Sequence, residues 1–309
     1  MIAPVSKFVA KQTEVFPRVE ESLMGRGFST IDSNLLLPSA NVLGVRVSAV
    51  DLKSAVDLSD QWIRSARGHG YVCAAGVHGV MEAHADPDLR QVLNHALINV
   101  PDGMPMSWVG HLQGFQNMDR VFGPDLMMAM CRLSVERGYR NFLYGGKPGV
   151  AALLSETLQR KIPGLQIVGT YTPPFRSLTL HEEKELLTQV RESRPHILWV
   201  GLSTPKQERF MAQYVDYLQV PLMFGVGAAF DFHTGAIRDC SPWIKRAGLQ
   251  WLHRLMQDPK HLWKRYLRNN PAFLWHIALQ LSRLREYPSE REAASMGPLH
   301  AVKSAGRTL

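Results

Sequence analysis

The feature that most limits the fold of this chain is a regular alternation that begins at residue 41. Runs rich in β-branched and aromatic residues are each followed by a stretch with helical spacing of its apolar residues. The strand-like runs are apolar on both faces, which indicates a mainly parallel sheet covered by helices. The expected strands are 43–50, 71–76, 96–100, 141–146, 165–171, 196–202 and 220–227. The expected helices are 51–67, 77–84, 87–95, 104–113, 125–137, 148–160, 180–192 and 205–218. In such an α/β sheet ligands bind at the carboxyl ends of the strands, so the loops there are the candidate site.

The pattern changes after residue 238, where only helix-like runs remain. Each of these runs opens on a proline (Pro242, Pro259 and Pro271), a residue that suits a first helical turn. We therefore expect four parts in the chain. These are a mobile leader (1–40), an α/β domain that carries the chemistry (41–237), a basic helical appendage (238–286) and a disordered tail (287–309).

The positive charge of the chain lies in its last quarter. The net charge is +8, and residues 238–309 hold 13 Lys and Arg against 5 Asp and Glu, so the rest of the chain is neutral. Four of the seven tryptophans also fall in this basic segment. We therefore expect the segment to meet an anionic partner.

Several classes of protein are disfavoured by the sequence. Three widely spaced cysteines without a CxxC argue against a disulfide framework and a zinc site, and they fit a reducing cytoplasm. The N-terminus has charges where a signal peptide would need an apolar core, and the longest apolar run (220–230) is too short to span a bilayer. His78, Glu82 and His84 do not have the spacing of a metal-binding HExxH motif, so we expect them on an ordinary helix face.

The first candidate loop carries Asp102, which follows an apolar strand and precedes a glycine and a helix. A carboxylate at a strand end can act as a general base toward a hydroxyl group. The alternative is a simple Asp-Gly turn, which this spacing also favours.

Two further loops have residue types that suit a phosphate or a sugar. Arg120 has a planar guanidinium that could hold a phosphate, and Asp125 could either bind substrate or favour the start of a helix. Gly145 and Gly146, followed by Lys147, lie between a strand and a helix, where backbone amides can bind an anion. Many ordinary turns also use glycine, so this loop alone is weak evidence.

The last two loops place charged and amide side chains after strands. Lys206, Gln207 and Glu208 lie on an expected first helical turn, with side chains toward the cleft, although a surface helix start would explain them equally well. Asp231 follows the last expected strand and leads into the basic appendage.

Taken together, these loops resemble one family. The order PDG, RxxGPD, FLYGGxxG, VGLSTPKQE, FGVGAAFDFHTG and RAGLQWLHRL is similar to the WecG/TagA/CpsF family of bacterial glycosyltransferases, glycosyltransferase family 26. The match runs from about residue 43 to residue 285. Six motifs in order make it far more specific than any single loop.

The resemblance implies a Rossmann-like fold and an inverting transfer that needs no metal and no other cofactor. It implies a UDP-sugar donor and a polyprenyl-diphosphate-linked sugar acceptor on the cytoplasmic face of the membrane. Asp102 falls on the proposed base of the family, and Arg120 and Gln207 fall on positions expected at the diphosphate or the sugar. The resemblance also suggests homo-oligomeric assembly, which no pattern in the sequence tests.

The same resemblance assigns the appendage to an anionic membrane surface. Its arginines are the expected membrane or diphosphate contacts: Arg238, Arg246, Arg254, Arg265 and Arg268. Tryptophans and arginines on short amphipathic helices suit such an interface. The alternative is a helical subdomain with an ordinary solvated basic face.

One departure from the family leaves the donor open. Many members carry Thr-x-Asn near the end of the second strand, where this chain has Ala74 and Gly76. The change favours a divergent member, for example a hexosyltransferase of exopolysaccharide biosynthesis, over an N-acetylmannosaminyltransferase.

Two other classes fit less well. A nucleic-acid-binding protein would explain the basic tail, but the tail lacks a helix-turn-helix or zinc-finger pattern. A nucleotide-linked dehydrogenase is disfavoured because the chain lacks the GxGxxG motif.

Overall fold

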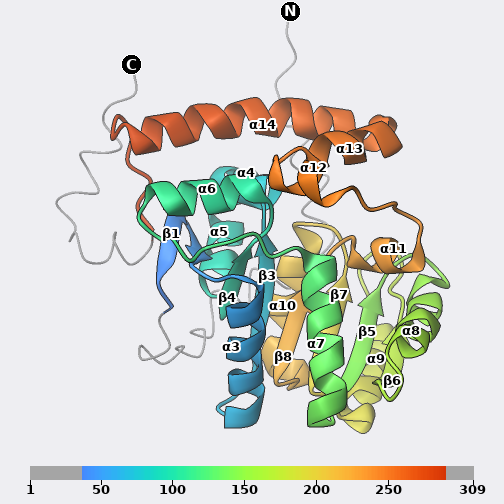
Figure 1. Ribbon diagram of the computed structural model, residues 1–309. Coiled ribbons are helices and arrows are strands. Elements are labelled where there is room, and N and C mark those ends of the chain that lie inside the picture. The colour runs from blue at the N-terminus through green and yellow to red at the C-terminus, as the bar shows by residue number, and fades with distance from the viewer. Residues whose placement is uncertain (1–36, 290–309) are drawn as a thin grey trace, which may run out of the picture.

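A six-stranded parallel sheet forms the centre of the computed structural model, which describes residues 37–289 (Figure 1). The strand order is β4-β3-β8-β7-β5-β6, and every neighbouring pair is parallel. The strands are β3 (Gly70–Ala75), β4 (Ile98–Pro101), β5 (Arg140–Gly145), β6 (Gln166–Tyr171), β7 (Ile197–Gly201) and β8 (Leu222–Gly225). The expected Rossmann-like α/β class is confirmed.

Helices cover both faces of the sheet and create two cores. Along β7, Leu198 and Val200 enter one core, and Ile197 and Trp199 enter the other. This alternation follows from the period of two in a strand. One face packs against α4 (Val77–Ala85), α5 (Pro87–Asn94), α9 (Leu180–Ser193) and α10 (Lys206–Leu218). The other packs against α3 (Leu52–Ser65), α7 (Gly123–Arg137), α8 (Val150–Lys161) and α11 (Ala229–Thr234), while α6 (Met104–Leu112) follows β4.

The first expected strand is wrong. Residues 43–50 do not join the main sheet, because β1 (Ser39–Val42) and β2 (Val45–Ser48) form a separate antiparallel hairpin. Its turn places Gly44 at φ +87°, a conformation that suits glycine. The run looked like a buried parallel strand because other elements of the fold cover the hairpin. Most of the expected leader lies outside the described residues, and the part that is described already enters β1.

The appendage consists of α12 (Pro242–Arg246), α13 (Gln250–Gln257) and α14 (Pro259–Leu281), and α14 lies across one end of the molecule (Figure 1). The expected helix start at Pro271 is wrong, because this proline lies inside α14. A proline removes one helical hydrogen bond, and here the burial of Asn269, Phe273 and Ile277 around it holds the helix together. No helix within residues 37–289 is both long enough and apolar enough to cross a bilayer.

The segment after α14 returns to the body of the protein. Tyr287 is buried, and its hydroxyl lies 2.8 Å from Nδ1 of His276 on α14. The expected tail at 287–309 therefore begins with residues that are packed, and its remainder from residue 290 lies outside the described part of the chain.

Candidate active site

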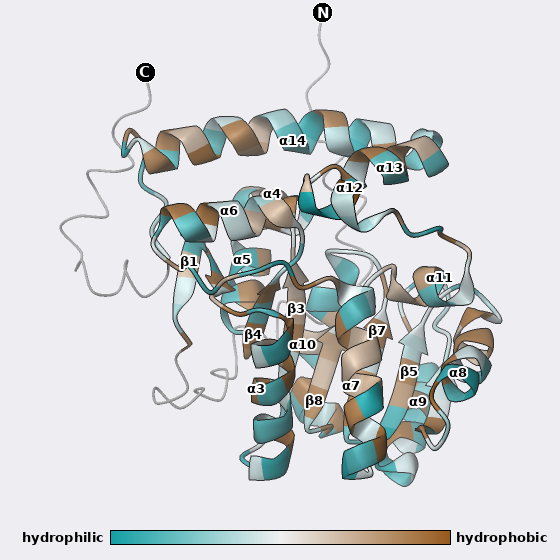
Figure 2. Ribbon diagram, viewed as in Figure 1, coloured by the Kyte–Doolittle hydropathy of each residue, from teal (hydrophilic) through white to brown (hydrophobic). Residues whose placement is uncertain are grey.

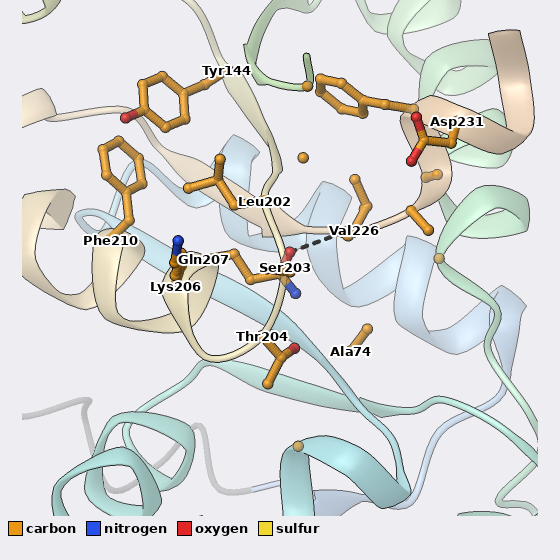
Figure 3. A pocket seen from close by; sticks show the side chains of 18 of the residues that line it. Ala74, Tyr144, Leu202, Ser203, Thr204, Lys206, Gln207, Phe210, Val226 and Asp231 are labelled. Carbon is orange, nitrogen blue, oxygen red and sulfur yellow. Dashed lines mark hydrogen bonds between the residues drawn. The ribbon is translucent and has the colours of Figure 1, made fainter. Parts of the chain in front are cut away.

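A cavity of about 460 Å³ opens at the carboxyl ends of the strands (Figure 3). Its lining comes from the loops after β3, β4, β5, β6, β7 and β8, and from the appendage. In the view of Figure 3, Tyr144 and Phe210 form one wall and Asp231 lies on the other side. The cavity is therefore at the place where a parallel sheet binds its ligands.

Asp102 lies on the wall of this cavity, directly after β4. Its backbone N–H donates to the carbonyl of Ala75 at 3.0 Å, so the edge of the sheet fixes its position. Burial raises the pKa of its carboxyl group, while the positive charges of Arg120 and Arg254 act against this increase. A carboxylate whose pKa is moved toward neutral pH is suited to accept a proton.

A glycine at position 76 is needed for steric reasons, because its backbone lies close to Asp102. A Cβ atom on Gly76 would lie 3.0 Å from the backbone oxygen of Asp102 and 3.5 Å from its Oδ2. Ala74 and Gly76 both line the cavity, so the space next to the carboxylate stays open.

Phe122, Phe232 and Arg254 line the cavity, and further cations lie against these rings. The guanidinium of Arg120 lies 4.5 Å from the ring centroid of Phe122, and that of Arg254 lies 5.6 Å from the centroid of Phe232. The two rings meet edge to face at 5.1 Å. Lys245 also lies over Phe122, at 5.3 Å. This arrangement gathers positive charge beside the cavity, close enough to act on Asp102.

Arg120 is also tied to the appendage. It donates to Oε1 of Gln250 on α13 at 2.8 Å, and its guanidinium lies 4.0 Å from the carboxylate of Asp125. Arg120 does not itself line the cavity, but its charge acts on Asp102. Asp125 is exposed in the first turn of α7 and lies outside the cavity lining.

The two glycines after β5 have different positions. Gly145 is buried at φ +123°, and a Cβ atom there would lie 2.5 Å from the carbonyl oxygen of Gly201. Its role in the structure is therefore the close approach of two strand ends. Gly146 and the exposed Lys147 line the cavity.

The first turn of α10 supplies a lysine and an amide to the cavity, and α11 supplies a carboxylate. Lys206, Gln207 and Asp231 all line it, and the Gln207 side chain extends between Thr204 and Val226 in Figure 3. Glu208 does not line the cavity, because its side chain is buried behind Gln207 with a relative exposure of 1%.

The arginines of the appendage fall into two groups. Arg254 and Arg265 line the cavity. Arg238, Arg246 and Arg268 are exposed and do not.

Of the three residues considered for a metal site, His78 and Glu82 are neighbours on α4, with Nδ1 and Oε1 3.6 Å apart, and His84 packs elsewhere. His78 also contacts Asn269, and the rings of His84 and His276 lie 4.5 Å apart between centroids with their planes tilted by 52°. Within residues 37–289, no group of three or more His, Cys, Asp or Glu side chains is arranged to hold a metal ion.

Comparison with known proteins identifies the family. The family model described as "Glycosyl transferase WecG/TagA/CpsF family" matches residues 40–287 of this chain. The chain belongs to this family.

Two curated relatives support the assignment. A protein of Bacillus spizizenii (strain ATCC 23059 / NRRL B-14472 / W23) is 28% identical over 186 residues, which is 60% of this chain and 70% of the relative. A protein of Bacillus subtilis (strain 168) is 26% identical over 182 residues, which is 59% of this chain and 69% of the relative. Both are named N-acetylglucosaminyldiphosphoundecaprenol N-acetyl-beta-D-mannosaminyltransferase. The protein is therefore a glycosyltransferase.

Several residues of this glycosyltransferase site were not singled out from the sequence. The aromatic pair Phe122 and Phe232 lies within two of the quoted motifs, but nothing in the spacing shows that the rings meet. Thr204 also lines the cavity, and so does His78, for which the sequence predicts only an ordinary helix face. Both residues follow strands that end at the site, β3 and β7, and this position was the signal in the sequence that could have identified them.

Proposed function

We propose that the protein transfers a sugar from a UDP-sugar to a polyprenyl-diphosphate-linked sugar acceptor, in bacterial surface or exopolysaccharide biosynthesis. The observation that carries the proposal is the half-buried carboxyl group of Asp102, on the cavity wall and under the influence of Arg120 and Arg254. The names of the two relatives support a lipid-diphosphate-linked acceptor.

In the proposed reaction, a carboxylate oxygen of Asp102 takes the proton of the acceptor hydroxyl. The hydroxyl oxygen forms a bond to the anomeric carbon of the donor sugar while the bond from that carbon to the β-phosphate oxygen breaks. The electron pair of the broken bond stays on the UDP, and a single displacement inverts the anomeric centre. Arg254, which lines the cavity, stabilises the charge on the leaving UDP, and the charge of Arg120 acts from beside the cavity.

The proposal includes metal independence, because Arg254 and Arg265 bring positive charge to the cavity that can take the place of a divalent ion. Turnover measured after extensive dialysis against EDTA should equal turnover with added Mg²⁺ or Mn²⁺. A loss of more than about tenfold on chelation, restored by one of these ions, would contradict this part of the proposal.

The donor sugar is the open part of the proposal. N-acetylmannosamine is the sugar in the names of the relatives. Ala74 and Gly76 lack the hydroxyl and the amide that many members of the family carry there, which favours a different hexosyl group, such as glucosyl, galactosyl or glucuronosyl. We propose a hexosyl donor as the first candidate and N-acetylmannosaminyl as the second.

The deciding experiment is UDP release with a panel of UDP-sugars and a short-chain lipid-diphosphate sugar as acceptor. Acceptor-dependent release from one donor is the expected result, with the product shown by mass spectrometry to be extended by one sugar. Release from none of the donors with the intact protein would overturn the proposed function.

We also propose that the appendage, residues 238–286, places the enzyme on the inner face of the cytoplasmic membrane. Large apolar side chains are exposed on α13 and on the outer side of α14, among them Trp251, Met256, Trp263 and Leu267. Figure 2 shows apolar and polar residues alternating along α14. Such helices bind an interface by burying their apolar side chains, with added attraction between basic residues and anionic lipid.

A further inference from the structure

Glu208 is a carboxyl group enclosed in the protein directly behind the active-site cavity. It lies in the first turn of α10 with a relative exposure of 1%. Its Oε1 accepts hydrogen bonds from Nε2 of Gln207 and from Oγ1 of Thr204, both at 2.9 Å. Its Oε2 has no hydrogen-bond partner within the described part of the chain. A buried carboxyl group with one oxygen unpaired destabilises a fold, so stability does not explain it.

The contact with Glu208 decides how the Gln207 amide is oriented. Oε1 of Gln207 accepts from the backbone N–H of Gly227 at 2.9 Å, in the loop after β8. Because a backbone N–H can only donate, the amide oxygen must face Gly227 and the amide nitrogen must face Glu208. Among residues 37–289 the second N–H of this amide has no protein acceptor. Since Gln207 lines the cavity, that N–H is available to a substrate oxygen.

The network continues from Glu208 to the appendage. The ring of His78 on α4 lies close to the backbone of Thr204, and its Nδ1 lies 3.0 Å from Nδ2 of Asn269 on α14. Burial, with the nearby charge of Arg265, lowers the pKa of His78 to about 4. The ring is therefore neutral at pH 7, so Nδ1 accepts from the amide of Asn269 while the other nitrogen carries the proton on the side of Thr204. Asn269 is itself buried, which fixes its side chain.

We infer that Glu208 is a positioning residue that fixes the Gln207 amide for the substrate, at the centre of a hydrogen-bond network that begins at Asn269 on the appendage. Thr204 links the two halves, because its backbone meets His78 and its hydroxyl meets Glu208. The orientation of an amide in the α/β domain thus depends on the placement of α14. The inference rests on the proposed glycosyl transfer, in which Gln207 contacts the sugar or the diphosphate.

Steady-state kinetics of two substitutions at Glu208 test the inference. Glu208→Leu removes the acceptor of the Gln207 amide and should lower kcat by about 10- to 100-fold, because a small misplacement of a binding group can cost that much. Glu208→Gln keeps an oxygen at the Oε1 position and should stay within about fivefold of the unaltered enzyme. The affinity for UDP, measured by calorimetry, should change less than kcat in both variants.

A double-mutant cycle separates positioning from a general structural effect. Gln207→Ala should lower kcat about as much as Glu208→Leu, and the double variant should lose no more than either single one. Additive losses would overturn the inference, and so would a Glu208→Leu enzyme with normal kcat.

Asn269→Ala gives a second test if Glu208→Leu does not fold. It should lower kcat about threefold to tenfold in the unaltered enzyme and not at all in the Gln207→Ala background. A loss of the same size in both backgrounds would show that Asn269 does not act through Gln207, and it would overturn the inferred network.

Asp60 provides the matched control. It is a buried carboxylate on α3, away from the cavity lining, and it accepts hydrogen bonds from Arg137 and Tyr139. Asp60→Asn should lower the melting temperature and leave kcat unchanged. If the intact enzyme releases no UDP from any donor, the proposed function fails. If it turns over and the cycle is additive, only the inference about Glu208 fails.

Discussion

The α/β domain and the appendage use apolar residues in opposite ways. The domain buries its apolar residues in two cores, one on each face of the sheet. The helices α12 and α13 of the appendage bury no residue, and much of the exposed aromatic surface lies on this part of the chain. The charge also differs, because residues 1–237 are neutral and the last quarter carries the whole excess of +8. The helices α12 and α13 therefore derive little stability from their own apolar side chains, which remain available for a surface outside the protein, whereas α14 also buries Phe273 and Ile277 in one of the cores.

The two regions nevertheless share one site. The α/β domain supplies Asp102, Gln207 and Asp231 to the cavity, and the appendage supplies Arg254 and Arg265. A division into a catalytic part and a membrane part is therefore too simple. The predictions below ask how far the two regions can be separated.

The largest effect is expected from Asp102→Asn in the α/β domain. The amide cannot accept the acceptor proton as a carboxylate does, so turnover should fall by about 10² to 10⁴-fold. UDP binding, measured by calorimetry, should change little, because the variant keeps the shape of the residue. Asp57→Asn, an exposed carboxylate on α3, is the control and should turn over normally. If the Asp102→Asn variant retains turnover, Asp102 is not the catalytic base.

The next largest effect is expected at the outer side of the appendage. Replacing Trp263, Leu267 and Leu274 by serine removes three exposed apolar side chains of α14, each of which contributes about 1 kcal/mol or more when buried in a lipid interface. Binding to anionic vesicles, measured by flotation, should weaken by about 100-fold, while turnover of a short-chain soluble acceptor should be kept.

The control for this variant replaces exposed apolar residues of the α/β domain. Val135→Ser with Leu153→Ser alters α7 and α8 and should leave vesicle binding unchanged. Equal weakening in both variants would show that the surface of the appendage has no special affinity for lipid.

A smaller effect is expected where the appendage enters the site. Arg254→Gln removes the charge that lies over Phe232, and kcat/KM should fall by about tenfold with a short-chain acceptor, since a hydrogen bond to a charged group contributes about 1.5 to 3 kcal/mol. Lys260→Gln removes the same charge from an exposed position on α14 and should keep kcat/KM within about twofold. Equal losses would mean that the overall charge of the appendage, and not its place in the cavity, supports turnover.

The sequence predicts the sheet well because each strand has its own local signal. Runs such as 141–146 and 196–202 are apolar on both faces, and they lie within a residue or two of β5 and β7. The signal fails at 43–50 and at Pro271, for related reasons. A covered hairpin has the same apolar pattern as a central strand, and packing around a helix can outweigh the cost of a proline inside it. Both outcomes depend on contacts between segments far apart in the sequence.

The candidate site follows the same rule. The loops after the strands were identifiable, because parallel strands place their carboxyl ends together, and Asp102, Gln207 and Asp231 lie where this rule puts them. The sequence could not show which of two adjacent residues enters the cavity. Gln207 and Glu208 are neighbours on one helical turn, and only the packing of α10 on the sheet turns Glu208 inward. The hydrogen bond between Arg120 and Gln250, 130 positions apart, is also beyond any local pattern.

The smallest effect is expected in the pH dependence of kcat/KM, and it tests whether both regions act on one carboxyl group. Asp102 must be ionised to act as the base, so activity should fall as the pH decreases through its pKa, which burial raises above the ordinary value of an aspartate. The charges of Arg120 and Arg254 lower this pKa, so Arg120→Gln and Arg254→Gln should each move the acidic limb of the profile to higher pH. The charge of Asp125 raises the pKa, so Asp125→Asn should move the limb to lower pH. Shifts in these opposite directions would show that charges from the α/β domain and from the appendage act on Asp102. If the acidic limb stays at the same pH in all three variants, the group that titrates there is not Asp102.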